Sequence, residues 1–569
     1  MKHLQKIAYK YRGLMIVYIL VGMIWTFTQG FSALYFQRVI DHFADNSLTL
    51  TEIIVYGLMM VTVYLLCYVQ NYPERKLEHG IGLSLKILAL RKMSVLDYRA
   101  YARMGTGVLI QRIESGAAAG SGILFGFYLR MAGELVPQML FSVLFIFMIH
   151  RTVMVAILVG YVAVFLVSNL LLRALYGVKA GILVNEERLN HVLVRGFMEM
   201  VVFRVNRRFG AELRKAESAA DEIVRSKVKM KLIHEAFFAI FVILVALLKI
   251  GMLAYGWMTK SMSIGEIVAL IALVDNAFMP IAIFNVCYVQ YKLDKVAFLR
   301  YAEFLDAEED VQLSVGEEIA ELDGSISFSG LRYRYDDREI FDGLDLEIAA
   351  GEMVAFVGES GSGKSTAVKL AVGLLHPDAG VIRVGGRPLQ SICLNSYYAF
   401  VAYLPQDPPI FDGSLRENIV FDDLVEDAVL REVLERVSLN SLFAKLEKGF
   451  ETPLGERGIS LSGGERQQLA LARLWFSKAR LIVLDEATSA MDNLTEAAVM
   501  QNVMEQLRGR TVLTIAHRLD SVRNYDRIVV FKEGRVVAQG AFETLLQDCR
   551  YFADLYYRSQ EESSCINSI

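Results

Sequence analysis

The chain has 569 residues, too many for one compact domain, and 54% of them are hydrophobic against 21% charged. This balance, with a mean hydropathy of +0.37, is more apolar than that of an average soluble protein. The formal net charge of −4 gives no support for nucleic-acid binding, because nucleic-acid-binding proteins carry a basic patch or stripe.

Apolar runs long enough to cross a bilayer are confined to the first half of the chain. A spanning helix needs about 20 mostly apolar residues. Six segments qualify, and they are roughly Leu14–Phe36, Ile53–Asn71, Gly122–Ile149, Val153–Leu175, Ala236–Trp257 and Ile264–Tyr288. Short links join these segments in pairs, whereas long polar stretches follow the second and the fourth. The long stretches keep helical periodicity, so we expect helices that extend beyond the membrane and turn once, near 97–107 and near 206–210.

The long polar stretches are basic. They include Lys86, Arg91 and Arg103 after the second segment and Arg204, Arg207 and Arg214 after the fourth. By the positive-inside rule these faces are cytoplasmic. We therefore predict a multi-pass protein of a bacterial inner or plasma membrane, with both termini and the C-terminal half of the chain in the cytoplasm.

Several ionisable residues fall inside the apolar runs, among them Arg130, Glu134, Lys249 and Asp275. A charge at the bilayer centre costs about 2.5–3.5 kcal/mol, so such residues usually face a cavity or a partner. Arg130 and Glu134 are four residues apart and share one helix face, so they can pair with each other. Two interpretations stay open for all four residues, structural ion pairing and a place on the path of a transported substrate.

The second half of the chain has the pattern of a soluble α/β domain. After Asp306 the composition turns polar, and strand-like alternation begins at Ser325. We place a membrane domain at residues 1–305, a linker at 306–324, the second domain at 325–558 and a C-terminal tail at 559–569.

A glycine-rich loop lies near the start of this second domain. The sequence GESGSGKST fits the pattern GxxxxGK[ST] and stands between a strand-like run and a helix-like run. Backbone N–H groups of such a loop close on a phosphate, and the helix N-terminus adds a favourable field. Lys364 is placed to reach the β- and γ-phosphates, and the Ser365 hydroxyl to bind Mg²⁺. The candidate ATP contacts are Gly358, Glu359, Ser360, Gly361, Ser362, Gly363, Lys364, Ser365 and Thr366.

Two carboxylates follow a second apolar strand. Leu481–Leu484 is typical of a buried parallel strand, which delivers Asp485 and Glu486 to its C-terminal edge. Asp485 is placed to hold Mg²⁺, directly or through water. Glu486 is placed to polarise an attacking water as general base.

A third motif provides another anion site. The sequence LSGGERQQ, from Leu461 to Gln468, places a glycine pair at the start of a helix. A monomer does not need two phosphate cradles. The simplest use of the second is to bind the γ-phosphate held by Lys364 of another copy, so that ATP joins two domains.

Together these motifs resemble the ATP-binding cassette (ABC) family, and within it the exporters whose half-transporters fuse six helices to one cassette. The resemblance covers essentially the whole chain. It implies that Gln406 is the glutamine that contacts Mg²⁺, that His517 is the switch histidine at the γ-phosphate, and that Tyr335 stacks on adenine, with Tyr333 a weaker candidate. It also assigns nucleotide contacts in the signature and the D-loop to Ser462, Gly463, Gly464, Glu465 and Asp492.

The resemblance implies a six-transmembrane-helix all-α domain with long cytoplasmic extensions, followed by an α/β P-loop ATPase domain. ATP and Mg²⁺ are the implied cofactors. The implied partner is a second half-transporter, in a homodimer or a heterodimer. We expect ATP-driven export or flipping of a small molecule, lipid or peptide. An importer built on the same fold and a membrane ATPase that regulates a channel remain alternatives.

Overall fold

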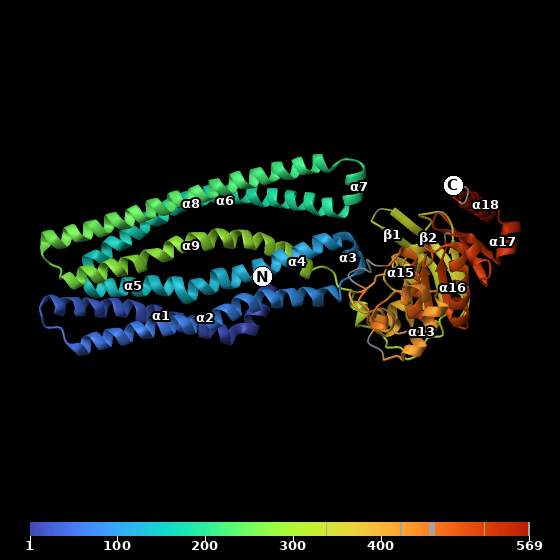
Figure 1. Cartoon of the computed structure of the whole chain (residues 1–569), viewed down its shortest axis with the longest axis horizontal. Helices are drawn as coiled ribbons and strands as arrows, with labels where there is room; N and C mark the ends of the chain where they lie inside the picture. Colours follow the sequence, from blue (N-terminus) through green and yellow to red (C-terminus); the bar gives the residue numbers. More distant parts are fainter. Residues whose placement is uncertain (337, 422–423, 455–460, 517, 567–569) are drawn as a thin grey trace. The chain divides into compact units, whose positions relative to one another are not determined.

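Long helices form the first of two units in the computed structural model (Figure 1). This membrane unit comprises residues 1–94 and 104–307. Its elements are α1 (Lys2–Ala44), α2 (Leu50–Met93), α4 (Thr106–Ser121), η1 (Gly122–Leu129), η2 (Met131–Leu135), α5 (Val136–Ile149), α6 (Arg151–Met198), α7 (Met200–Val205), α8 (Phe209–Thr259) and α9 (Ile264–Leu305). The structure describes all residues except 337, 422–423, 455–460, 517 and 567–569, and only the backbone of 106, 108, 165, 167–176, 179–180, 183, 187 and 561–566.

The predicted membrane helices are present. Among the described residues, five helices are long and apolar enough to cross a membrane: Lys2–Ala44, Leu50–Met93, Leu109–Ile149, Phe209–Thr259 and Ile264–Leu305. The remaining predicted span, Val153–Leu175, lies in α6, whose described part Arg151–Val164 is apolar. The 44 residues of α2 span about 66 Å at about 1.5 Å per residue, twice the thickness of the hydrocarbon core. The helices therefore extend well beyond the bilayer.

Helix starts and pairings in this unit follow local chemistry. Thr49 begins α2 and Ser263 begins α9, each with a capping box in which side chain and backbone exchange hydrogen bonds with a glutamate three residues later. In Figure 1, α1 runs beside α2, α6 beside α8, and α9 beside α5. The stretch of η1 and η2 is π-helical, so the helix between Gly122 and Leu135 is wider than an ordinary α-helix.

Short helices lie near both of the turns predicted outside the membrane. The first, α3 (Tyr98–Met104), falls within 97–107, and residues 95–103 belong to the second unit by their contacts. At the other turn, α7 precedes the bend at 206–208, so the short helix lies just before the predicted 206–210.

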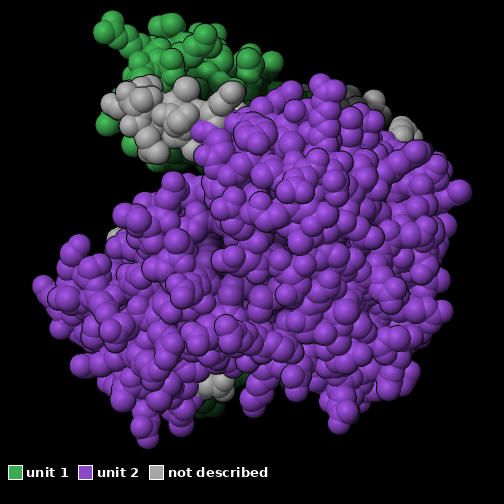
Figure 2. Space-filling view, turned by 90° about the vertical axis from the view of Figure 1, so that its right-hand side faces the viewer, with its two compact units in different colours: residues 1–94, 104–307 green, residues 95–103, 308–569 purple. Residues whose placement is uncertain are grey.

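The second unit, residues 95–103 and 308–569, is coloured purple in Figure 2. It contains two sheets. An antiparallel sheet has the order β2 (Arg338–Ile348), β1 (Ile326–Tyr335), β4 (Ala379–Val384) and β5 (Arg387–Pro388). The other sheet has the order β10 (Arg535–Gly540), β9 (Arg527–Lys532), β3 (Met353–Val357), β8 (Thr511–Ile515), β7 (Leu481–Asp485) and β6 (Val401–Leu404). In this second sheet every pair is parallel except β10 with β9.

Helices cover this unit, and its core lies on both faces of the mainly parallel sheet. The helices are α10 (Lys364–Ala371), α11 (Leu394–Tyr398), α12 (Leu415–Val420), α13 (Asp427–Arg436), α14 (Asn440–Phe443), α15 (Gly463–Ala472), α16 (Asn493–Gln506), α17 (Phe542–Asp548) and α18 (Arg550–Ile566). Strand β7 shows how the core is divided: Leu481 and Val483 belong to one hydrophobic cluster, Ile482 and Leu484 to another. Successive strand side chains point to opposite faces, so an unbroken apolar run is buried on both sides. The predicted fold class, a helical membrane domain followed by an α/β domain, is confirmed.

Candidate functional site

Strand register brings the separate sequence motifs to one edge of the parallel sheet. Phe356 of β3 and Asp485 of β7 both pair with Ile515 of β8, and Leu404 of β6 pairs with Leu484. The strands run parallel, so the residues that follow them emerge at the same edge, where α/β proteins bind ligands. The glycine-rich loop, the two acidic residues and the Gln406 loop therefore converge on one site.

The loop from Gly358 to Gly363 has a backbone that fits a phosphate. Gly358, Gly361 and Gly363 have φ values of 145°, 80° and 108°, in the region where only glycine is unstrained. A Cβ on Gly363 would lie 2.7 Å from the Phe341 ring, so that position excludes other residues. Ser365 and Thr366 occupy the first turn of α10, and the helix N-terminus therefore points into the loop.

Lys364 closes this loop. Its Nζ donates hydrogen bonds to the backbone oxygens of Gly358 at 2.7 Å and Glu359 at 2.9 Å, and the residue is 5% exposed. Burial lowers the pKa of the Lys364 ammonium, while the charges of Glu486 and Asp485 act in the opposite direction. Lys364 thus lies within electrostatic reach of both carboxylates of the second motif.

The two acidic residues have different surroundings. Asp485 is buried and accepts a hydrogen bond from the Tyr403 hydroxyl at 3.1 Å. Glu486 accepts a 2.6 Å hydrogen bond from the Gln406 side-chain amide. Its backbone has a φ of 51°, which is strained for a glutamate and is a feature that concentrates at active sites. This backbone turn directs Glu486 away from the continuation of β7.

The signature motif begins α15 with a capping box. Ser462 accepts a hydrogen bond from the Glu465 backbone N–H, and the Glu465 carboxylate accepts one from the Ser462 backbone N–H at 2.8 Å. The two glycines after Ser462 have a packing reason of their own. A Cβ on Gly463 would lie 3.2 Å from the Ala490 Cβ, and one on Gly464 would lie 3.2 Å from the Ala490 carbonyl oxygen.

Gln467 is a functional residue that sequence reasoning missed. Its amide nitrogen contacts the Ser489 hydroxyl at 3.1 Å and the Gln406 carbonyl at 3.3 Å, and its amide oxygen accepts from the Ala490 N–H at 2.9 Å. It is 4% exposed. Gln467 therefore ties the signature helix to the loop of Gln406 and to the loop after Glu486. A buried glutamine on the apolar side of a short helix was the available signal.

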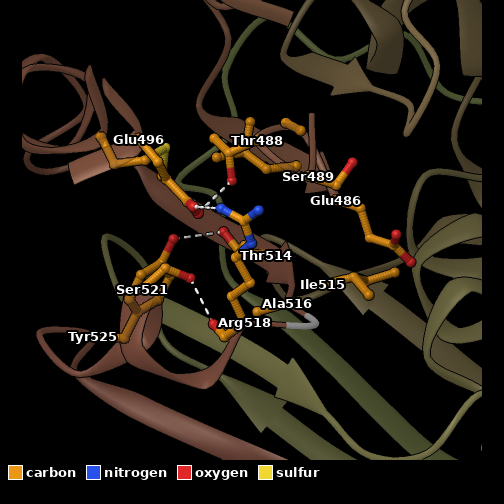
Figure 3. A pocket seen from close by; sticks show the side chains of 13 residues that line it. Glu486, Thr488, Ser489, Glu496, Thr514, Ile515, Ala516, Arg518, Ser521 and Tyr525 are labelled. Carbon is orange, nitrogen blue, oxygen red and sulfur yellow. Dashed lines mark hydrogen bonds and ion pairs between the residues drawn. The ribbon is translucent and has the colours of Figure 1, made fainter. Parts of the chain in front are cut away.

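Sequence reasoning also missed a group of interacting polar residues near Glu486, which Figure 3 shows. Glu496 accepts hydrogen bonds from the Thr488 hydroxyl at 2.7 Å and from Arg518 at 2.6 Å. The same Arg518 nitrogen donates to the Met491 carbonyl at 3.0 Å. The Glu486 carboxylate points away from this ion pair. Arg518 thus links the loop that follows β8 with the loop that follows β7.

Two other predicted contacts have different outcomes. Asp492 caps α16, and its carboxylate accepts the Thr495 N–H at 2.9 Å. That hydrogen bond lowers the pKa of the Asp492 carboxyl. Asp492 therefore has a structural role in addition to the nucleotide contact that is predicted for it. His517 lies outside the described residues, as does Glu456, for which the family resemblance implies a contact with a cytoplasmic turn of the opposite half-transporter.

The candidate adenine platform has one exposed ring. Tyr335 is 38% exposed, whereas Tyr333 is fully buried, and the two rings meet edge to face at 5.0 Å. The guanidinium of Arg99, from α3, lies 4.5 Å from the Tyr333 ring centroid and also donates to the His376 carbonyl at 2.9 Å. Only the ring of Tyr335 is available for stacking at this place, which favours it over Tyr333.

The residues at this edge fit a nucleotide with a magnesium ion. Ser365, Gln406 and Asp485 supply hydroxyl, amide and carboxylate oxygens, the donor types that Mg²⁺ prefers. Within the described part of the chain, no group of three or more His, Cys, Asp or Glu side chains forms a metal site. Mg²⁺ is usually held by one or two carboxylates and by substrate phosphates, and Asp485 is the carboxylate in this set.

The four predicted intramembrane charges are paired in the structure. Arg130 lies 3.3 Å from Glu134, which also accepts a 2.6 Å hydrogen bond from the Tyr18 hydroxyl. Lys249 of α8 lies 2.6 Å from Asp275 of α9. Mutual pairing accounts for the presence of these charges in apolar helices without a transported ligand.

Comparisons with known proteins agree on a family. Residues 341–489 match the family described as ABC transporter. An uncharacterized ABC transporter ATP-binding protein of Bacillus subtilis is 36% identical over 290 residues, 50% of this chain and 50% of the relative. An ATM1-type heavy metal exporter of Novosphingobium aromaticivorans is 30% identical over 385 residues, 65% and 63% of the two chains. An ATP-dependent lipid A-core flippase of Alcanivorax borkumensis is 36% identical over 257 residues, 45% and 44%.

A solved structure extends the likeness to the membrane unit. The structure of a bacterial Atm1-family ABC exporter with ATP bound matches with a TM-score of 0.80 and 22% identity, over 97% of this chain and 99% of that chain. The sequence matches span about half the length of the Bacillus relative and less than two thirds of the other two. Residues 341–489 thus match the ABC transporter family, and the chain has the exporter fold in which a helical membrane domain is fused to an ATP-binding cassette.

Proposed function

We propose that this chain is one half of an ATP-driven transporter that exports or flips its cargo across the membrane. The observation that carries the proposal is the convergence of Lys364, Glu486 and Gln406 at one sheet edge, in a cassette fused to membrane helices. The named relatives include an exporter and a flippase, which favours export over uptake.

In this proposal Glu486 is the general base for ATP hydrolysis. The Gln406 amide holds its carboxylate at 2.6 Å and keeps it oriented toward the site. Lys364 neutralises phosphate charge, and the loop N–H groups hold the phosphate in place. A bound Mg²⁺ supplies further charge neutralisation, and Ser365, Asp485 and Gln406 are the residues that would hold it. His517 is proposed to contact the γ-phosphate.

The working unit is proposed to contain two cassettes. Each chain has one phosphate loop and one capped signature helix, and the signature of one copy would complete the site of the other. Beside the exposed charges of Glu199, Arg204 and Arg207, the tip of α6 and α7 exposes a group of apolar side chains, and this group supports the arrangement. These side chains are Phe197, Met198, Met200, Val201, Val202 and Val205, between 42% and 81% exposed. An exposed apolar group outside the membrane is expected to be covered by a partner, here the cassette of a second half-transporter.

The test is made on this chain expressed alone in lipid nanodiscs. Particle mass and ATPase rate are recorded for the wild-type chain and for Glu486→Gln, which serves as the inactive control. A dimeric mass with Glu486-dependent turnover supports a homodimeric transporter. A dimer that hydrolyses ATP at the same rate in both samples contradicts the proposed role of Glu486. A monomer without turnover contradicts a homodimer and requires a different partner chain.

A further inference from the structure

A cavity of about 430 Å³ lies between helices of the membrane unit. Its walls include Met131 of η2, Met139 of α5, Tyr161 of α6, and Pro280 and Phe284 of α9. Among the described lining residues, Tyr161 alone carries a polar side-chain atom, and its hydroxyl is engaged by the Ala277 carbonyl at 2.9 Å. The volume lies in the range of about 300–1,000 Å³ that is typical of small-molecule sites. The cavity therefore suits an apolar molecule or an apolar part of one.

The backbone around this cavity is irregular on two sides. Met131 and Leu135 belong to the π-helical η2, a form of helix that is rare and frequent at functional sites. Elsewhere in the cavity wall, Pro280 interrupts the hydrogen bonding of α9. Met131 and Met139 have flexible, polarisable side chains that adapt to ligands of different shape.

Aromatic rings continue from the cavity along α9. Phe284, in the cavity wall, stacks with Tyr288 at 5.7 Å, and the ammonium of Lys292 lies 5.4 Å from the Tyr288 ring centroid. These three residues are one turn apart from each other, on one face of the helix. Beside them the hydroxyls of Tyr128 and Tyr291 meet at 3.2 Å. The surface thus changes from apolar to hydroxyl-bearing to cationic.

The exposed charge at the far end of this surface is positive. Lys292 and Lys295 are both exposed. Asp294, between them in sequence, is buried and accepts a hydrogen bond from Gln290 at 2.7 Å. Arg130 and Glu134, the nearby charges on the π-helical stretch, neutralise each other at 3.3 Å.

We propose that the membrane domain binds an anionic amphiphile, with its apolar body in the cavity and its acidic head group at Lys292 and Lys295. The eight residue steps from Phe284 to Lys292 correspond to about 12 Å of helix, which suits a medium-length alkyl chain. Lys292 follows the predicted span Ile264–Tyr288, so the head group would lie near the cytoplasmic membrane surface. This inference rests on the proposed function, because it identifies the chemical class of the cargo.

The test uses dodecyl phosphate that carries a photoactivatable diazirine at the end of its chain. The full chain is reconstituted without nucleotide in phosphatidylcholine nanodiscs, irradiated and mapped by mass spectrometry. We expect labelling of the peptides that contain Met131, Met139 and Phe284. Met139→Trp, which fills the cavity, is expected to reduce labelling at least five-fold. Met148→Trp is the matched control, because Met148 lies on the same helix but is 60% exposed, and it is expected to leave labelling unchanged.

A separate experiment tests whether the acidic head group binds at Lys292 and Lys295. The double variant Lys292→Gln with Lys295→Gln is expected to reduce labelling by the phosphate probe several-fold and to leave a neutral dodecanol probe unaffected. Equal labelling of Met139→Trp and wild type, or equal labelling by a trimethylammonium probe, overturns the proposal. Competition by phosphatidylglycerol in the nanodisc identifies a membrane lipid as the source, and its absence identifies a soluble amphiphile. Labelling needs no ATP hydrolysis, so its failure is distinct from a failure of the proposed transport function, which the ATPase rate reports.

Discussion

The side-chain amide of Gln406 donates a 2.6 Å hydrogen bond to the carboxylate of Glu486, although the two residues are 80 positions apart in sequence. The parallel pairing of β6 with β7 brings them together, because both residues follow the C-terminal ends of adjacent strands. A neutral amide at this place can orient the carboxylate without neutralising its negative charge. Gln406 is thus a positioning residue for the proposed general base as well as a candidate magnesium ligand.

Replacement of Gln406 tests this relationship. In Gln406→Ala the Glu486 carboxylate loses its donor, so we expect the ATPase kcat to fall by about ten-fold or more, which is part of the roughly 10²–10⁴-fold that general acid–base catalysis contributes. The affinity for ATP measured without Mg²⁺, and therefore without turnover, is expected to change little. Gln390→Ala, at an exposed glutamine of the same domain, is the control and is expected to behave as wild type. An unchanged kcat in Gln406→Ala contradicts the positioning role.

The pKa of Lys364 predicts how nucleotide affinity depends on pH. Burial lowers the pKa of the free ammonium, and a bound phosphate raises it again by opposite charge. The affinity for ATP is therefore highest below the pKa that Lys364 has in the free protein. It is lost as the pH rises from that pKa toward the higher pKa that Lys364 has in the ATP complex. We expect ATP binding, measured by titration between pH 7 and pH 10, to weaken on the alkaline side. Lys364→Ala should bind ATP more weakly throughout and lack this alkaline loss. Identical pH profiles for the two proteins contradict the assignment.

The Arg518–Glu496 pair is predicted to stabilise the cassette. The Glu496 side chain is 7% exposed and Arg518 is 42% exposed. Removal of one partner of a fully buried pair costs about 3–5 kcal/mol, and the exposure of Arg518 reduces our expectation to about 2 kcal/mol. For a domain of this size, a destabilisation of about 2 kcal/mol in Arg518→Ala lowers the melting temperature of the cassette by about 4–8 °C. Arg436→Ala breaks an exposed pair with Glu432 and should change the melting temperature by about 2 °C or less. Equal shifts of the melting temperature in the two variants would contradict the predicted stabilising role of the Arg518–Glu496 pair.

Arg99 is predicted to hold α3 on the cassette. Its guanidinium packs on the Tyr333 ring and donates to the His376 carbonyl. In Arg99→Ala we expect faster amide hydrogen exchange in residues 95–103, because local opening becomes easier. Arg91→Ala, at an exposed arginine in the last turn of α2, should not change exchange in that segment. Unchanged exchange in Arg99→Ala shows that other contacts hold α3.

Much of this fold was predictable because its signals are local in sequence. Apolar runs of spanning length predict the membrane helices, and the strand–loop–helix context of Lys364 predicts the phosphate cradle. The apolar strand before Asp485 and Glu486 predicts that these two carboxylates lie at the sheet edge, whereas the role of Gln406 came from the family resemblance alone.

The contacts that sequence reasoning missed depend on long-range packing. Gln467 and Arg518 act through partners about 20 or more residues away, and nothing in their immediate neighbours indicates which loops they join. The Lys249–Asp275 pair likewise depends on how α8 meets α9. Asp492 is different, because its capping of α16 is a local contact with Thr495, three residues away, that sequence reasoning also missed.

The measurement that tests the account most directly is ATP retention by Glu486→Gln. The purified variant and the wild-type chain are incubated with Mg²⁺ and ATP, and the nucleotide that remains bound after gel filtration is identified. The account predicts that the variant keeps unhydrolysed ATP, one molecule per chain in a dimer, while the wild type turns its ATP over and releases ADP. Hydrolysis by Glu486→Gln at the wild-type rate would contradict the account, because Glu486 could not then be the general base.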